Sequence, residues 1–252
     1  MKRKAIIIAN VASDLPGTQV DIANIRNFLK SLQGGAWYEH EICILENPSR
    51  ASLITELNDV KKTVDFSIVF FTGHGDRDET QTRFNLNDSG QLMFENDLKG
   101  LSPRQINVFD CCRVLASGHV ANDMMLEAAM ESYSSRPEFL TESQARMLYQ
   151  RRIENTPPQT VTLYSCSEDE YSLDTENGGL FISSLLKQAE KFSNSSQSYR
   201  TALSCIGDIR DAVRQKSARV ENNAQNPAWV APRLLPENQL ILSLNPYLHA
   251  HL

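Results

Sequence analysis

The sequence lacks any long apolar run. No stretch of its 252 residues approaches the ~18 consecutive apolar residues of a membrane helix. The apolar residues 5–9 follow a basic start and are too short for a signal peptide, so we interpret them as a buried strand. Positive charge is not in excess either, since 25 lysines and arginines stand against 31 aspartates and glutamates. Because nucleic-acid binding needs a basic surface, we expect neither nucleic acid nor membrane as a partner.

Cysteine is scarce and irregularly spaced. The five cysteines are Cys43, Cys111, Cys112, Cys166 and Cys205. The odd number, the adjacent pair and the lack of C-x-x-C spacing argue against a disulfide framework and a structural zinc site. We therefore expect a reducing, cytoplasmic compartment and no bound metal. The sequence also lacks G-x-G-x-x-G and a P-loop, which argues against a nucleotide-binding domain. Only His74 is well placed for a metal-dependent hydrolase.

Apolar residues alternate between strand and helix spacing along the chain. We expect strands at residues 5–9, 40–45, 66–71, 106–109, 160–164 and 240–244. We expect helices at 20–32, 53–64, 96–101, 180–192 and 199–220, a hairpin centred on 87–90, and a charged, helix-prone segment at 118–158. Strands that alternate with helices are joined by right-handed crossovers. The chain is therefore predicted to form a single α/β domain with a mostly parallel sheet of about six strands flanked by helices.

Reactive side chains follow three of these predicted strands. His74, Cys112 and the Ser-Cys-Ser turn at 165–167 each come directly after one. In parallel sheets, functional groups collect at the carboxyl ends of the strands. A histidine there can take the proton of a cysteine thiol and later protonate the leaving amine. The backbone N–H groups of Gly75 and Cys112 would then form an oxyanion hole.

The segments around these residues resemble those of caspases and metacaspases. Residues 72–75 read Thr-Gly-His-Gly, and residues 110–113 read Asp-Cys-Cys-Arg. Metacaspases carry S-G-H-G and D-S-C-H-S-G, whereas animal caspases carry H-G and Q-A-C-R-G. Both families place the nucleophile third in the second motif, which selects Cys112 over Cys111. The chain departs from the pattern in that extra cysteine and in Val114-Leu115, where S-G is usual.

Three further segments extend the resemblance over most of the chain, in the same order. Residues 15–29 resemble the first helix of metacaspases, with Asp21 retained. Residues 165–174 resemble S-G-C-x-D-D-Q-x-S-A-D, the stretch that opens the small-subunit half. Residues 179–186 resemble the caspase G-x-F-T-x-x-L stretch. The resemblance implies a caspase-like three-layer sandwich of the stand-alone prokaryotic kind.

The resemblance implies an activity and an organisation. The activity is that of a cysteine endopeptidase with a Cys-His dyad and a thioester acyl-enzyme, and the alternative is an inactive scaffold on the same fold. The organisation is a large-subunit-like half at 1–117, a linker at 118–158 and a small-subunit-like half at 159–252. Such enzymes are often zymogens cut in the linker, where Arg151-Arg152 is a candidate site. A role in bacterial defence or regulated cell death, and an activating partner protein, are further expectations.

The resemblance also implies a pocket for the residue before the scissile bond. Its predicted lining is Asp21, Thr72, Asp110, Ser165 and Cys166. Metacaspases place acidic residues there and cleave after basic ones, whereas animal caspases place arginines there and cleave after aspartate. Two carboxylates would attract a guanidinium, so we expect cleavage of protein substrates after arginine or lysine.

Many metacaspases bind calcium through acidic residues after the histidine. Here that region offers Asp76, Asp78, Glu79, Asp88, Glu95, Asn96 and Asp97. The family's paired aspartates appear as Glu95-Asn96, which loses one charge. Because calcium prefers six to eight oxygen ligands, including several carboxylates, we expect activity without calcium and without any other cofactor.

Overall fold

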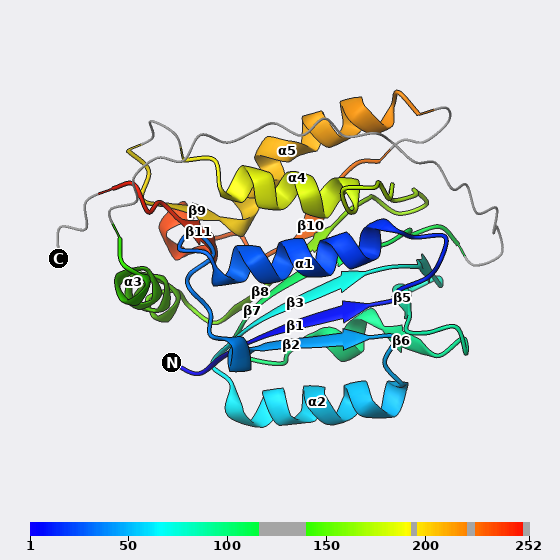
Figure 1. The fold of residues 1–252 in the computed structure, drawn as a ribbon, viewed down its shortest axis with the longest axis horizontal. Helices are drawn as coiled ribbons and strands as arrows, with labels where there is room; N and C mark the ends of the chain where they lie inside the picture. Colours follow the sequence, from blue (N-terminus) through cyan, green and yellow to red (C-terminus); the bar gives the residue numbers. More distant parts are fainter. Residues whose placement is uncertain (116–139, 193–195, 221–224, 249–252) are drawn as a thin grey trace.

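The centre of the fold is a six-stranded sheet with the strand order β10-β8-β7-β3-β1-β2 (Figure 1). The computed structural model describes residues 1–115, 140–192, 196–220 and 225–248. The strands of the sheet are β1 (Arg3–Ala9), β2 (Ile42–Glu46), β3 (Phe66–Thr72), β7 (Arg104–Asp110), β8 (Gln159–Tyr164) and β10 (Ala228–Val230). All neighbours pair in parallel except β10, which is antiparallel at one edge. The predicted mostly parallel sheet is confirmed.

The register of the sheet brings the site-bearing loops together. β3 is buried over its whole length, as expected for a strand covered on both faces. Ala9 at the end of β1 is level with Thr72 of β3, and Thr72 is level with Asp110 of β7. The loops that carry His74 and Cys112 therefore start side by side at the same edge of the sheet.

Helices cover both faces of the sheet, which confirms the three-layer sandwich (Figure 1). One face carries α1 (Gly17–Lys30), α4 (Leu180–Ala189) and α5 (Ala202–Ser217), with α3 (Glu142–Glu154) at one end. The other face carries α2 (Arg50–Thr63). It also carries a small sheet of β4 (Gly75–Arg77), β5 (Thr82–Asn85) and β6 (Leu92–Phe94), followed by η2 (Glu95–Leu98). Within the described residues, no helix has both the length and the apolar character needed to cross a membrane.

Neighbouring residues of each strand serve opposite faces. Phe70 packs in the core beneath α1 and α4, whereas Phe71 packs in the core beneath α2. Alternation along a strand produces this division. The hairpin predicted at 87–90 is confirmed, because β5 and β6 pair antiparallel on either side of it.

The sixth strand of the sheet is not the predicted one. The expected strand at 240–244 forms β11 (Ile241–Leu244), which pairs with the short β9 (Tyr199–Thr201) outside the central sheet. β10 takes the edge position instead. Its three residues are too few to show a strand period, so the pattern did not reveal it. Among the described residues, the two remaining elements are the short 3-10 helices η1 (Glu39–Glu41) and η4 (Pro236–Asn238).

Part of the predicted linker belongs to the folded core. The helix α3 lies within residues 118–158, and its apolar side buries Ala145, Tyr149 and Ile153. Residues 118–139 lie outside the described part of the chain. Arg151 is in the last turn of α3, together with Arg152. A peptidase needs an extended segment, so helix α3 would have to unwind before a cut could occur there.

Candidate active site

A tight loop after β3 presents His74. Gly73 has a φ of 141°, and a side chain there would meet Asn10 at 2.6 Å, so glycine is required. The Gly73 N–H donates to the Asp110 carbonyl at 3.2 Å. The His74 carbonyl accepts from the Asn85 N–H at 3.0 Å, which ties the loop to β5. These bonds orient the His74 ring, whose Nε2 lies 2.9 Å from Asp14 Oδ2.

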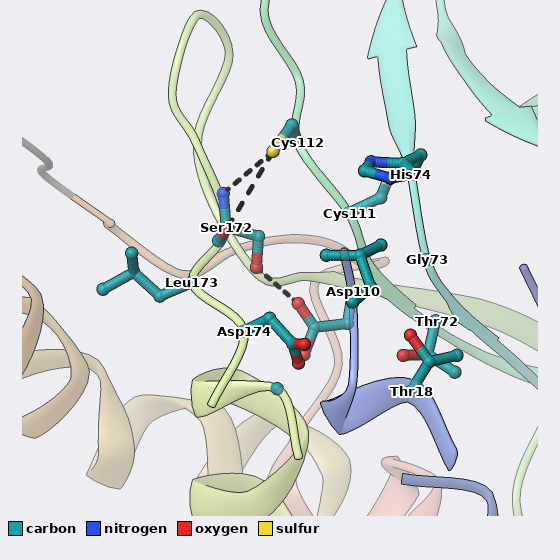
Figure 2. A pocket seen from close by; sticks show the side chains of 12 residues that line it. Thr18, Thr72, Gly73, His74, Asp110, Cys111, Cys112, Ser172, Leu173 and Asp174 are labelled. Atoms are coloured by element: carbon teal, nitrogen blue, oxygen red, sulfur yellow. Dashed lines mark hydrogen bonds between the residues drawn. The ribbon is translucent and has the colours of Figure 1, made fainter. Parts of the chain in front are cut away.

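Cys111 and Cys112 serve different sides of the sheet, as alternation predicts. Cys111 is buried with the apolar residues beneath α2. The Cys112 sulfur lines the opening beside His74 and points toward Ser172 (Figure 2). The Ser172 N–H donates to Cys112 Sγ at 3.4 Å. Burial raises the pKa of the Cys112 thiol, and this N–H offsets only part of the effect. The thiol is therefore protonated at neutral pH and needs a base.

The two residues share the wall of a small cavity of about 40 Å³ (Figure 2). Four predicted site residues line it: Thr72, His74, Asp110 and Cys112. Further lining residues are Leu15, Thr18, Gly73, Cys111, Ser172, Leu173, Asp174 and Gly179. Asp174 and Ser172 belong to the motif at 165–174, but sequence reasoning did not assign them to the pocket. Their contacts with the cavity depend on the loop after β8 folding back over β7.

Carboxylates dominate one side of the cavity. Asp110 accepts from the Ser172 hydroxyl and, at 3.2 Å, from the Ile182 N–H. Asp174 accepts from the Gly17 N–H at 2.8 Å. A Cβ on Gly179 would overlap an Asp110 carboxylate oxygen, so glycine permits the close approach of α4.

Asp21 of α1 lies behind the carboxylates that line the cavity, and its side chain is buried between α1 and β3. It accepts from the Thr72 hydroxyl at 2.7 Å and from the Gly179 N–H at 3.0 Å. Burial raises the pKa of Asp21 well above its usual range, and the neighbouring Asp110 charge raises it further. Burial also raises the pKa of Asp110, and the Asp174 charge adds to that. The bonds described for Asp21 and Asp110 come from backbone N–H groups and hydroxyls, which are neutral donors.

The strand pairing of β4 fixes the direction of the Gly75 N–H, which was predicted to form part of the oxyanion hole. Gly75 lies opposite Phe84 of β5, and this pair is not a hydrogen-bonded one. The neighbouring pair is, since the Asn85 N–H donates to the His74 carbonyl. In antiparallel pairing, the N–H of the residue between two bonded pairs points away from its neighbour. The next N–H with this orientation, that of Arg77, donates to the Val114 carbonyl at 2.9 Å. The Gly75 N–H therefore faces the chain segment that carries Cys112.

Comparisons with known proteins identify the family and the fold of the chain. The family model of the caspase domain matches residues 2–238. The chain belongs to the caspase-domain family of cysteine peptidases. A crystal structure of a Geobacter sulfurreducens protein is similar with a TM-score of 0.55 and 16% identity, covering 98% of both chains. Caspase-1 from Spodoptera frugiperda is similar with a TM-score of 0.55 and 14% identity, covering 91% of this chain and 86% of that one. No curated protein sequence matches the chain significantly.

Two predicted pocket residues of this caspase domain lie beneath the cavity. Ser165 and Cys166 are fully buried. Ser165 accepts from the Cys111 N–H at 3.2 Å and donates to its carbonyl at 3.1 Å. The Cys166 thiol lies 3.4 Å from the same carbonyl. Their geometry favours support of the nucleophile segment over the predicted contact with substrate.

Arg113, which the resemblance aligned with the caspase arginine, is also structural here. Its guanidinium stacks on the Tyr164 ring at 4.1 Å and donates to the Cys166 carbonyl at 3.2 Å. Its backbone N–H donates to the Glu170 carbonyl at 3.0 Å. Arg113 therefore joins the loops that follow β7 and β8, and it is turned away from the carboxylate side of the cavity.

Three of the acidic residues after His74, Asp76, Glu95 and Asp97, pair with basic side chains. Arg83 holds Asp76 with bonds of 2.6 and 2.8 Å. Lys99 lies 2.5 Å from Glu95, which also accepts from the Tyr164 hydroxyl at 2.6 Å. Across the described residues, no group of three or more histidine, cysteine or acidic side chains is arranged to hold a metal ion.

Proposed function

We propose that this caspase domain is an endopeptidase that cleaves protein substrates after arginine and, less efficiently, after lysine. Cys112 is the nucleophile and His74 the general base. The observation that carries the proposal is the shared cavity that joins these two residues to Asp110 and Asp174. A substrate whose carbonyl lies at Cys112 would direct its preceding side chain toward the carboxylates.

The chemistry starts from the protonated thiol. His74 takes the proton from Cys112 Sγ, and the sulfur attacks the scissile carbonyl carbon. The N–H groups of Gly75 and Cys112 stabilise the oxyanion. The C–N bond then breaks as His74 returns its proton to the leaving amine, which leaves a thioester on Cys112. Water, deprotonated by His74, hydrolyses the thioester and restores the thiol.

The carboxylates favour arginine over lysine. A guanidinium presents a planar fork that can bond two carboxylate oxygens at once, whereas an ammonium acts as a point charge. Asp110 and Asp174 line the cavity, and the deeper Asp21 supports the wall behind them through its bonds with Thr72 and Gly179. A buried charge contact of this kind contributes well above the ~0–1 kcal/mol of a surface pair.

The cavity is narrow in the structure, although it opens to solvent beside His74. Its volume of about 40 Å³ holds a few water molecules. Ser172 fills the space between Asp110 and Cys112 by bonding to both. Movement of the segment around Ser172 would widen the cavity for a substrate side chain. This supports the proposal of a latent enzyme that is opened by its substrate or by an activating partner protein.

The proposal also covers the cofactor requirement, the cellular compartment and the biological role of the enzyme. The neutralised carboxylates Asp76 and Glu95 support activity without calcium or another cofactor. All five cysteines are free thiols, which supports a reducing compartment such as the cytoplasm. A role in bacterial defence or cell death is consistent with a latent protease.

A panel of fluorogenic peptides tests the specificity directly. Peptides that end in Arg, Lys, Asp or Leu differ only in the residue that enters the cavity. We expect hydrolysis in the order Arg, then Lys, with little for Asp or Leu. A preference for Asp or Leu would contradict the pocket assignment and leave the dyad intact.

Cysteine variants test the dyad. We expect Cys112→Ala to abolish cleavage, and His74→Ala to be nearly as damaging because grouped catalytic residues act as a unit. Cys111→Ala is the matched control, since it removes an adjacent thiol that packs in the core. Folded wild-type protein that cleaves none of the peptides, and whose Cys112 reacts with iodoacetamide no faster than in His74→Ala, would favour the scaffold alternative over a latent enzyme.

A further inference from the structure

The loop between β1 and α1 places a carboxylate against the catalytic histidine. Asp14 Oδ2 lies 2.9 Å from His74 Nε2, although the two residues are 60 positions apart in the chain. An ionised carboxylate only accepts hydrogen bonds, so Nε2 must carry the proton. Nδ1 is then the ring nitrogen left to take the proton of Cys112. The contact therefore selects one tautomer of the neutral ring.

The loop that carries Asp14 is anchored on both sides of the contact. At its start, the Asn10 N–H donates to the Thr72 carbonyl at 3.0 Å, next to the His74 loop. Val11 is held by Asn47, whose side chain bonds both its N–H and its carbonyl. At its end, the Gly17 N–H donates to Asp174. The position of Asp14 is thus set by the same strand ends and pocket residues that build the site.

We propose that Asp14 is a positioning residue that completes an Asp14–His74–Cys112 triad. It holds the ring with Nδ1 available as the base, and it stabilises the imidazolium that forms when Cys112 loses its proton. The inference rests on the proposed function, because it assigns a role within the same proton transfer. Asp14 itself touches neither substrate nor thiol.

The exposure of the pair limits the size of the effect. The His74 and Asp14 side chains are 34% and 40% exposed. Water screens such a contact and can replace part of it, unlike the fully buried aspartate of a protease triad. We therefore expect Asp14→Asn to lower kcat by about 10- to 100-fold on an arginine peptide, with little change in KM. Asp59→Asn, on the exposed side of α2, is the matched control for loss of one charge and should have no effect.

A second background separates positioning from general damage. In a His74→Ala protein, Asp14→Asn should cause no further loss of the residual rate, since the residue acts only through the ring. A similar loss in both backgrounds would mean that Asp14 supports the loop rather than His74. A rise in kcat for Asp14→Asn would mean that the contact restrains the histidine, and it would overturn the proposal.

A spectroscopic measurement tests the contact independently of activity. Long-range ¹H–¹⁵N correlation spectra of the ring distinguish the two neutral tautomers of His74. We expect the Nε2–H form in the wild type and a mixture of forms in Asp14→Ala. The Nε2–H form with no peptidase activity would sink the proposed function and leave the contact standing. An Nδ1–H form in an active wild type would sink the triad and leave the peptidase standing.

Discussion

Replacement of Asp110 by asparagine should stabilise the free protein and disable it as an arginine-specific peptidase. Burial raises the pKa of Asp110 to about 6 from an ordinary value of 3.8. This difference corresponds to about 3 kcal/mol of stability that the folded chain loses when Asp110 ionises. Asparagine keeps the shape, accepts from the Ile182 N–H and can donate to the Ser172 hydroxyl. It also removes the negative charge that the Asp174 carboxylate repels.

The sign of the effect depends on pH. Because the pKa of Asp110 is higher in the folded chain, the folded state binds more protons between about pH 4 and pH 6. Wild-type stability at this site therefore falls as the pH rises through that window and stays low above it. Asp110→Asn avoids the loss. We expect a gain of up to about 3 kcal/mol at pH 7.5, or about 5–10 °C in Tm, and a small difference at pH 4.

Activity should change in the opposite direction. Loss of one partner from a buried charge pair costs about 3–5 kcal/mol, so kcat/KM for an arginine peptide should fall by about 100-fold or more. Thermal unfolding at the two pH values and peptide hydrolysis at pH 7.5 measure both effects, with Asp211→Asn on the exposed surface of α5 as the control. A variant that is less stable than wild type at both pH values, or that keeps full arginine activity, would refute the reasoning.

Three further outcomes are expected. Because Lys99 neutralises Glu95, peptide hydrolysis in EGTA should equal that in millimolar calcium, and complete loss restored by calcium would contradict this. In the predicted linker at 118–158, Arg136 precedes a proline, and the other arginines, Arg146, Arg151 and Arg152, lie in helix α3. The enzyme should therefore stay a single band on a gel while it cleaves peptides, and fragments from a cut in this linker would show otherwise. Burial raises the pKa of Glu41, but bonds from Arg146 and Arg3 outweigh burial and lower this pKa to about 2, so Glu41→Gln should cost about 3 kcal/mol of stability at pH 7. This stability is present above pH 4.5 and is lost as the pH falls through about 2. Equal urea midpoints for the variant and the wild type at pH 7 would refute it.

The sequence by itself determined five of the six strands of the central sheet and the two reactive residues. Apolar runs such as 66–71 are strongly patterned, and parallel topology places the loops after neighbouring strands at the same edge of the sheet. The strand pattern alone was therefore enough to bring His74 and Cys112 together. Family-like motifs added Asp21 and Asp110, whose carboxylates do lie at the cavity or directly behind it.

Only the tertiary structure decided which other side chains complete the site. Asp14 meets His74 across 60 positions, and Ser172 meets Asp110 across 62. A local pattern carries no information on such contacts, because they depend on how separate loops fold over one strand edge. The same reason explains Ser165, which follows a strand as predicted but turns beneath the site to hold the Cys111 backbone. Strand periods predict where a loop begins, whereas packing of the loops against one another determines which way each side chain faces.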